Sequence, residues 1–444
     1  MKEYDQNTLL QLAQRAFETA VREGAEQAEA SAGVGKNTNV EIEKSSIKST
    51  DAKAGNSISI RAFFRGGTGF ASTDRLDETS VIETAKSAAQ LAKIAEPDTD
   101  FISLPGPGAY SEIRDLFDQK IADMDVRDII AACINGIDSA KEVNADAVVS
   151  GGASVRHGAW AIANSLGVAA SGRDTSIGMF TMVIVKRMDD VGAFYDFDEA
   201  RSLSDFSPEG IGKSAAEMAI RFLGARKIET KVMPVIFGPL AGISVFGAVA
   251  GTASAEGVQR NRSFLIGKLG QKIGSDVITI TDDPLIPGGL SSRICDAEGF
   301  PSKKTVIMEN GILCTYLHNS YTSNKAKAPN TGHASSHGIG PTNLIPKLGN
   351  KTAAEIISEV DEGIYINLGG ISPNPITGEV SASIDFGFKI EKGELAYPVK
   401  NTMIGGSFLD MLMNTDAVSC DFRSEPGMIM PTVRILAVNV AGGQ

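Results

Sequence analysis

The sequence predicts an α+β protein whose two halves differ in character. In the N-terminal half, amphipathic helical segments enclose runs of strand-like segments, and this order of elements occurs twice. In the C-terminal half, strand-like segments dominate and surround one uncharged segment rich in glycine and alanine. Helices and strands therefore come in separate runs, which favours α+β over the regular alternation of a parallel sheet.

The length of the chain predicts at least two domains. Its 444 residues exceed what one hydrophobic core usually supports. We expect an N-terminal α+β domain over residues 1–225 and a C-terminal, strand-rich domain over 226–444. Residues 96–107 hold three prolines and no periodicity, so they are expected to link two smaller units, 1–107 and 108–225.

We favour the hypothesis that these two units are copies of one helix–strands–helix unit. Residues 6–22 place leucine, alanine, phenylalanine and valine on one helical stripe. The strand-like segments that follow often alternate in polarity, as strands with one solvent-exposed face do. The closing helices share a local match, KSAAQLA from Lys86 and KSAAEMA from Lys213. Chance similarity is the alternative, because short alanine-rich matches are common in helices.

The elements expected in the two units follow this pattern. In the first unit we predict helices at 6–22 and 77–95 and strands at 27–34, 37–48, 55–65 and 67–72. In the second unit we predict helices at 125–143 and 207–223 and strands at 147–157, 159–163, 167–171, 175–187 and 190–197.

The segment from Pro234 to Ala255 is the most distinctive part of the chain. It has 22 residues without a charge, which is long enough for a membrane span. Pro239 argues against a span, because proline suits the first turn of a helix and breaks a helix interior. We therefore predict a strand at 232–237 and a helix at 240–255, about 24 Å long and short for a bilayer. Its small side chains predict burial on all sides in a soluble core.

Strands dominate the remainder of the C-terminal half. We predict strands at 276–281, 304–308, 312–318, 363–368, 379–391, 394–397 and 432–440 and short helices at 352–360 and 407–414. Asn310 and Gly311 form a typical hairpin turn. Residues 323–343 form a long polar loop, and such loops are usually functional or mobile.

The composition argues against several classes of partner. The chain has 54 acidic and 42 basic residues, a net charge of −12, which repels nucleic-acid phosphates and anionic lipid. We therefore expect neither nucleic acid nor membrane as a partner. The N-terminus lacks the apolar core of a signal peptide, so a cytoplasmic location is expected. The cysteines, at positions 133, 295, 314 and 420, form no CxxC pair and suit a reducing compartment.

The residues alone form no catalytic constellation. None of the four histidines, at positions 157, 318, 333 and 337, belongs to an HExxH motif, and the GxSxG and phosphate-loop motifs are absent. His333 and His337 have the spacing of a helical metal pair, but surrounding glycines and prolines argue against a helix there. A polar loop that caps or contacts a peptide is the favoured interpretation.

Five motifs in the second half stand out: FGAVAGTASAEGVQRNRSFL at 246–265, DAEG at 296–299, NGIL at 310–313, TGHA at 331–334 and VNVAGG at 438–443. In sequence and order they resemble the TldD/PmbA family, whose members have been named modulators of DNA gyrase. The agreement in spacing extends over most of the chain, and the details resemble the PmbA (TldE) branch.

The resemblance carries an expectation about zinc. The TldD branch looks like a zinc peptidase, with HExxxH on the central helix and a C-terminal cysteine ligand. In this sequence Phe246 replaces the first ligand, Gly247 replaces the carboxylate and Gly251 replaces the second ligand. Cys420 lies near the region of the sulfur ligand, but one thiolate falls short of the three protein ligands of a catalytic site. We therefore expect a peptidase-like C-terminal domain that binds no metal.

The function implied by the resemblance is that of a partner subunit. The chain would pair with a TldD-like, zinc-binding chain in a cytosolic heterodimeric metallopeptidase that cleaves or trims unfolded, extended peptides, and it could form homodimers when alone. His318, Asn319, His333 and His337 are candidates for contact with the peptide or the partner. The alternatives are a stand-alone peptide-binding or regulatory protein without peptidase activity, and an enzyme whose acids or hydroxyls form no motif we identify.

Overall fold

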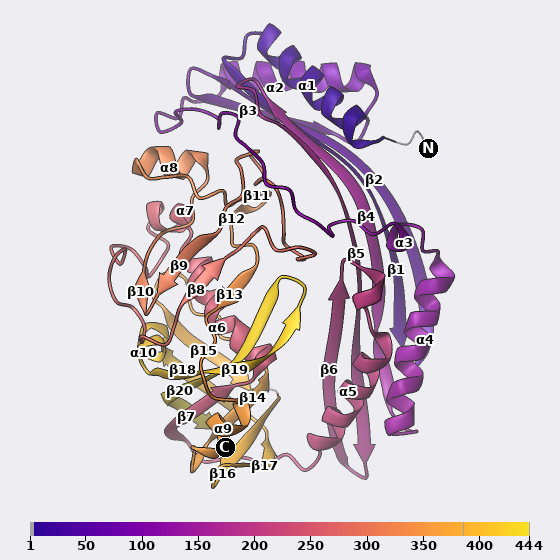
Figure 1. Ribbon diagram of the computed structural model, residues 1–444, viewed down its shortest axis with the longest axis vertical. Coiled ribbons are helices and arrows are strands. Elements are labelled where there is room, and N and C mark those ends of the chain that lie inside the picture. Colours follow the sequence, from indigo (N-terminus) through magenta and orange to yellow (C-terminus); the bar gives the residue numbers. More distant parts are fainter. Residues whose placement is uncertain (1–3, 385, 444) are drawn as a thin grey trace.

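The computed structural model describes residues 4–384 and 386–443 and shows the expected α+β fold. In Figure 1 the long strands of the N-terminal half, indigo to magenta, curve along one side of the C-terminal half, which is orange to yellow. The segment between α2 and α3 has almost no regular structure, as expected for a linker.

The elements of the N-terminal half have the following bounds. Its helices are α1 (Gln6–Arg22), α2 (Glu78–Ile94), α3 (Gln119–Ala122), α4 (Val126–Val143) and α5 (Pro208–Arg221), with a 3-10 turn η1 (Leu203–Asp205). Its strands are β1 (Gln27–Glu43), β2 (Ser46–Phe64), β3 (Gly67–Thr73), β4 (Val148–Asn164), β5 (Ala169–Arg187) and β6 (Asp190–Ala200).

These strands form one antiparallel sheet in the order β3-β2-β1-β4-β5-β6. The expected breaks within β1 at residues 35–36 and within β4 at 158 are wrong, because both strands continue through them. Gly35 pairs with Gly55 on one side and with Gly158 on the other. Pairing on both sides supplies the backbone hydrogen bonds that keep glycine extended, although glycine alone disfavours a strand.

The same order of elements occurs twice in this sheet. A helix, three strands and a second helix run from α1 to α2, and the same series runs from α4 to α5. The sheet order is also symmetrical about its centre, where the first strand of each series pairs with the other. A common origin of the two units remains a hypothesis.

All four long helices of this half pack on one face of the sheet, which we call the outer face. Small side chains, mostly alanine, of α1 and α2 pack against β1, β2 and β4 and form one core. Larger aliphatic side chains of α4 and α5 pack against the other ends of β1 and β4 and against β5 and β6. They form a second core, which continues into the C-terminal half. Asp5, Asp77 and Asp125 cap the starts of α1, α2 and α4 through their side chains. The opposite face, the inner face, is turned toward the C-terminal half.

The elements of the C-terminal half have the following bounds. Its helices are α6 (Pro239–Thr252), α7 (Ala255–Gln259), α8 (Ser320–Ala326), α9 (Ala353–Ser358) and α10 (Phe408–Met413). Its strands are β7 (Lys231–Phe237), β8 (Ile280–Asp282), β9 (Thr305–Glu309), β10 (Ile312–Leu313), β11 (Ala334–Ser335), β12 (Gly338–Ile339), β13 (Leu344–Pro346), β14 (Glu362–Leu368), β15 (Glu379–Ile384), β16 (Phe386–Glu391), β17 (Glu394–Val399), β18 (Thr402–Ser407), β19 (Thr415–Glu425) and β20 (Met428–Gly442).

The large sheet of this half has the order β15-β18-β20-β7-β14-β16-β17, with β19 paired to β20. β7 leads directly into α6, as the sequence predicts, and the turn at Asn310–Gly311 joins β9 to β10. The predicted strand 312–318 is wrong beyond Leu313, and β18 and β19 were not predicted. β18 holds two glycines and β19 many polar residues, so neither shows a strand pattern; their pairing with β15 and β20 decides their structure.

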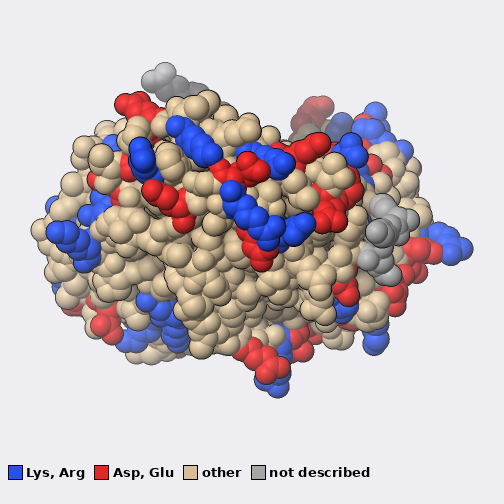
Figure 2. Space-filling model, turned by 90° about the horizontal axis from the view of Figure 1, so that it is seen from above, with Lys and Arg blue, Asp and Glu red and all other residues tan. Residues whose placement is uncertain are grey.

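None of the helices in the described ranges combines the length and the apolar character needed to cross a bilayer. The face shown in Figure 2 carries blue and red side chains intermixed, without an extended basic field. This agrees with the acidic net charge of −12.

The close contact between α4 and α5 leads to a testable prediction about stability. A Cβ added at Gly212 would lie 1.9 Å from the carbonyl oxygen of Gly136. Gly212→Ala must therefore push the helices apart, and we expect it to destabilise the fold by about 1–3 kcal/mol or more. Gly210→Ala on the same helix, whose Cβ would lie 3.5 Å from the Ser207 hydroxyl, should instead be neutral or stabilising by up to about 1 kcal/mol. Urea unfolding of both variants measures the difference, and equal stabilities would contradict the packing argument.

Candidate functional site

Residues 246–251 of α6, which we call the α6 window, stand at the place of the expected zinc motif and differ in their surroundings. Phe246 is 1 % exposed and belongs to the main core of the C-terminal half. Gly247 and Gly251 lie on another side of the helix, where an added Cβ would meet no atom within 4 Å. The helix is thus anchored by a buried ring and is bare at the two glycines.

The expectation that this helix is buried on all sides is therefore wrong. One face, including Val245, Phe246 and Val249, packs into the core. The opposite side is only partly covered, and Gly251 is exposed. Small side chains on a helix permit close approach on every face, but here nothing in the described chain occupies the space beside the two glycines.

The residues of this window do not fit a zinc site. A phenyl ring and two hydrogen atoms offer no ligand, and the ring is fixed in the core. Cys420 is partly exposed and carries a thiol, while its backbone N–H donates to the carbonyl oxygen of Lys351. Within residues 4–384 and 386–443, no three His, Cys, Asp or Glu side chains are grouped so that they could hold a metal ion.

Part of the polar loop predicted at 323–343 is buried. The loop contains the end of α8 and the small β11–β12 hairpin, and β13 follows it. His333 is 1 % exposed, and its Nε2 lies 3.0 Å from Asp282 Oδ2 while its Nδ1 lies 2.9 Å from the Thr331 hydroxyl. Asp282 is fully buried and also accepts hydrogen bonds from the backbone and hydroxyl of Thr342. These contacts fix the loop to β8.

The four candidate contact residues divide into two pairs. His318 and His333 are both buried, so contact of their rings with a peptide would require the loop to open. Burial lowers the pKa of His318, which favours its neutral form. Asn319 caps α8 and lines a small pocket of about 320 Å³, and His337 is exposed at the tip of the β11–β12 hairpin. The structure does not bring the four into one site.

The structural role of Asp282 cannot be predicted from the sequence. Two adjacent carboxylates before a proline, as at Asp282, Asp283 and Pro284, are typical of a turn. Asp283 fits this expectation, because its side chain accepts a hydrogen bond from the backbone N–H of Leu285. Asp282 instead ends β8 with its side chain turned inward to His333, which is 51 residues away in the chain. A pair so distant in sequence leaves no local signal.

A cavity of about 1230 Å³ lies between the inner face of the N-terminal sheet and the C-terminal half, and we call it the central cleft. The sheet contributes strands β1, β2, β4 and β5. The segment between α2 and α3 contributes residues 110–113 and 115–117, and the C-terminal half contributes residues 292–297 and the β11–β12 hairpin. The sequence did not predict this cleft, because its walls come from three distant parts of the chain.

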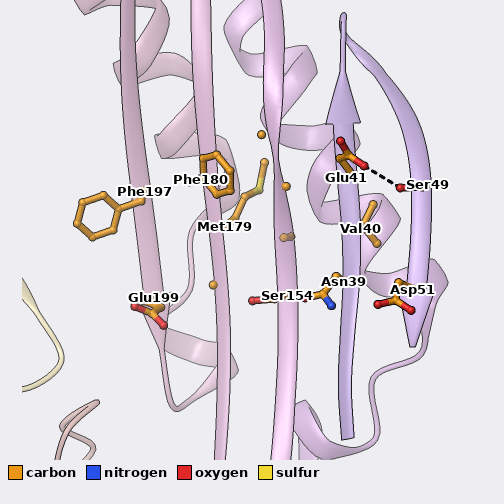
Figure 3. A pocket seen from close by; sticks show the side chains of 14 residues that line it. Asn39, Val40, Glu41, Ser49, Asp51, Ser154, Met179, Phe180, Phe197 and Glu199 are labelled. Carbon is orange, nitrogen blue, oxygen red and sulfur yellow. Dashed lines mark hydrogen bonds between the residues drawn. The ribbon is translucent and has the colours of Figure 1, made fainter. Parts of the chain in front are cut away.

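A second hollow of about 610 Å³ continues along the same face of the sheet. Figure 3 shows its side chains on neighbouring strands, with Ser154 and Asn39 near its centre and the Glu41–Ser49 hydrogen bond at one side. Ser154 precedes Arg156 of the central cleft by two residues, so the two hollows are adjacent on β4.

Ion pairs join the two halves at two places. Arg61 lies between Glu29 of the sheet and Glu298 of the C-terminal half, with distances of 2.5 and 3.4 Å. Arg423 of the β19–β20 hairpin contacts Asp196 of β6 at 2.5 Å. Burial raises the pKa of Glu29, against the opposing effect of Arg61.

Asp296 lines the cleft and is also buried. Its carboxylate accepts hydrogen bonds from the backbone N–H groups of Glu298, Phe300 and Ala334. Burial, with a contribution from the charge of Glu298, nevertheless raises the pKa of Asp296 to about 6. The ionised carboxylate is therefore held at a cost to the folded state near neutral pH.

Comparison with known families gives three matches along the chain. Residues 230–442 match the PmbA/TldA metallopeptidase C-terminal domain, residues 119–223 match the central domain, and residues 28–92 match domain 1. Along the chain, domain 1 comes first, then the central domain and then the C-terminal domain. Together the three matches extend over both halves described above.

Individual relatives and a solved structure agree with these matches. An uncharacterized protein of Methanocaldococcus jannaschii is 29% identical over 89% of this chain and 91% of its own length. The protein named metalloprotease PmbA of Escherichia coli O157:H7 is 25% identical over 89% of this chain and 88% of its own. The crystal structure of TldE from Thermococcus kodakarensis superimposes with a TM-score of 0.90 at 26% identity, covering 97% of this chain and all of the other.

The α6 window makes a prediction about stability. Phe246→Ala should destabilise the protein by about 3–5 kcal/mol, because it leaves a cavity in the core. Gly247→Ala and Gly251→Ala should each stabilise it by roughly 0.5–1 kcal/mol, because the added methyl group meets open space and alanine favours a helix. Chemical unfolding of the three variants measures these changes. Loss of stability in both glycine variants would contradict the open environment described here.

Asp296 makes a prediction about pH. Between about pH 6 and its ordinary value of 3.8, the folded state binds a proton at Asp296 that the unfolded state does not. The contribution of Asp296 to the free energy of unfolding therefore rises by about 1 kcal/mol as the pH falls from 7 to 5. Asp296→Asn should lack this increment, because its side chain does not titrate. Urea unfolding at pH 5 and pH 7 tests it; an equal increment in the variant and the wild type would assign it to another group.

Proposed function

This chain belongs to the PmbA/TldD metallopeptidase family, and we propose that it acts there as the subunit without zinc. In this proposal it pairs in the cytoplasm with a TldD-like chain that carries HExxxH, and the pair cleaves or trims extended, unfolded peptides. The observation that carries the proposal is the α6 window, where Phe246, Gly247 and Gly251 stand in place of the residues that would bind metal and activate water.

The burial of Phe246 supports this assignment. A ligand lost by a recent substitution would leave a polar pocket, whereas this ring packs among core side chains. Phe246→His would lose packing in the core. A zinc site would in addition need new side chains at Gly247 and Gly251. The zinc-binding chain would supply the Lewis acid and the general base. This chain would supply a surface for its partner and for peptide.

Two of the candidate contact residues suit that surface role as they stand. His337 is exposed at the tip of a hairpin whose Ser335 and Ser336 line the central cleft. Asn319 lies at the start of α8, beside the smaller pocket between the two halves. We propose these two for contact with peptide or partner, while His318 and His333 would act by holding the loop in place.

A stand-alone peptide-binding protein without a peptidase partner is the second candidate. The central cleft favours it as much as it favours the first, because a binding cleft needs no partner to function. The two proposals differ in whether the chain has a zinc-binding relative as its stable companion. The domain division at residues 225 and 226 is part of both proposals.

Metal analysis of the purified chain, alone and with its companion, tests the proposal. The chain alone should contain far less than one zinc per molecule and should not cleave an unfolded substrate such as casein. Affinity purification from the source lysate should recover a chain with HExxxH, and the complex should contain about one zinc per pair and cleave casein. Stoichiometric zinc with peptidase activity in this chain alone would overturn the proposal. Recovery of no such companion would favour the stand-alone protein.

A further inference from the structure

We propose that residues 106–115, which we call the strap, are a movable wall of the central cleft that opens while the rest of the protein stays folded. The strap is part of the segment between α2 and α3, which runs between the two halves of the molecule in Figure 1. Residues 110–113 and 115 of the strap line the cleft. Opening of the strap therefore gives solutes a way into the cleft from this side.

The chain is anchored to the sheet on either side of the strap. Before it, Pro105 is buried, and its carbonyl oxygen accepts a hydrogen bond from the side chain of Asn164 at the end of β4. After it, the carbonyl oxygen of Leu116 accepts a hydrogen bond from the backbone N–H of Thr175 on β5. The ends of the strap are therefore fixed, and a movement of the strap can leave both anchors in place.

Between these anchors few contacts hold the strap. From Gly106 to Ile113, no backbone N–H or carbonyl group forms a hydrogen bond with the described residues. Eight of the ten residues of the strap are exposed. A segment with few buried contacts and with backbone groups open to solvent has a low free energy of local opening. The strap should therefore open far more often than the whole protein unfolds.

Tyr110 holds the middle of the strap in place. Its hydroxyl donates a hydrogen bond to the carbonyl oxygen of Gly299 in the C-terminal half, at 3.0 Å. Its ring packs against a small apolar cluster of three buried residues, Ile162, Ala170 and Cys295. These residues come from both halves, so one side chain closes the strap over the junction between the sheet and the C-terminal half.

Two glycines of the strap differ in the space beside them. An added Cβ at Gly108 would lie 2.5 Å from Pro301 Cγ, so the closed strap has no room for a side chain there. An added Cβ at Gly106 would meet no atom within 4 Å. Neither glycine has a positive φ angle, so the backbone at both positions suits alanine. Alanine should therefore push the strap outward at Gly108 and leave it in place at Gly106.

Cys295 can report on the opening of the strap. It is one of the residues along the cleft, but it is only 4 % exposed and lies against Tyr110. Burial raises the pKa of its thiol to about 12, so in the closed state it reacts slowly, because the thiolate is the nucleophile. Cys133 is fully buried on α4, in the core of the outer face, and burial raises its pKa to about 11. Cys133 therefore reports on unfolding of the whole protein.

The measurement is the rate at which iodoacetamide labels each thiol of the folded chain, read by mass spectrometry of the separated peptides. Each rate is divided by the rate of the same thiol in the urea-unfolded chain. In the wild type, Cys295 should react faster than Cys133 by about tenfold or more. Urea below the unfolding transition should hardly change the rate at Cys295 but should raise the rate at Cys133, because local opening exposes far less surface than global unfolding.

Variants of the strap assign the reactivity of Cys295 to its opening. Gly108→Ala should raise the rate at Cys295 by about threefold or more, because the added methyl group pushes the strap away from Pro301. Tyr110→Phe should raise it by roughly two- to tenfold through the loss of one hydrogen bond. Gly106→Ala is the matched control and should not raise it.

Two results would overturn the inference. One is labelling of Cys295 in the wild type at the rate of Cys133, because opening would then require unfolding of the whole protein. The other is a rate at Cys295 that is no higher in Gly108→Ala than in Gly106→Ala, because the strap would then not control access. Neither measurement involves zinc or a companion chain, so these results do not bear on the proposed function.

Discussion

The fold of the N-terminal half depends on the continuous pairing of β1 with β4. The two strands are antiparallel partners over every residue from Glu29 opposite Asn164 to Ile42 opposite Gly151. Because side chains alternate between the faces of a strand, this one register decides which residues of both units meet the outer helices and which meet the C-terminal half. A shift by one residue would move the alanine side chains of one strand from the outer face, where the helices cover them, to the inner face. Every feature of the inner face is therefore a consequence of this pairing.

The sequence allowed prediction of elements with a strong internal pattern. The helix at residues 6–22 agrees with α1 at both ends, because its apolar stripe and the Asp5 cap are local signals. The length of β1 and β4 could not be predicted, because glycine and polar residues near 35 and 158 indicate breaks unless their partners are known. β18 and β19 were missed for the same reason. Strand pairing is a long-range interaction, and a single sequence contains no record of it.

The site shows a similar division. The three window residues of α6 could be singled out from the resemblance, but the open space beside Gly247 and Gly251 could not be predicted. The role of Asp282 and the burial of His318 and His333 could not, because each depends on contacts between β8, the polar loop and α8. A histidine in a glycine-rich polar loop is expected at the surface. Here His333 in the loop and His318 just before α8 both lie in the interior.

Ion pairs and apolar contacts together set how the two halves are placed relative to each other. Arg61 contacts both Glu29 of the sheet and Glu298 of the C-terminal half, and these two carboxylates are buried. Such pairs add little net stability, because desolvation offsets much of the attraction, but loss of one partner is costly. Apolar packing also joins the halves, because Cys295 packs with Ile162 of the sheet and the core beneath α4 and α5 continues into the C-terminal half. The ion pairs therefore orient the two halves, whereas the apolar contacts supply most of the stabilisation.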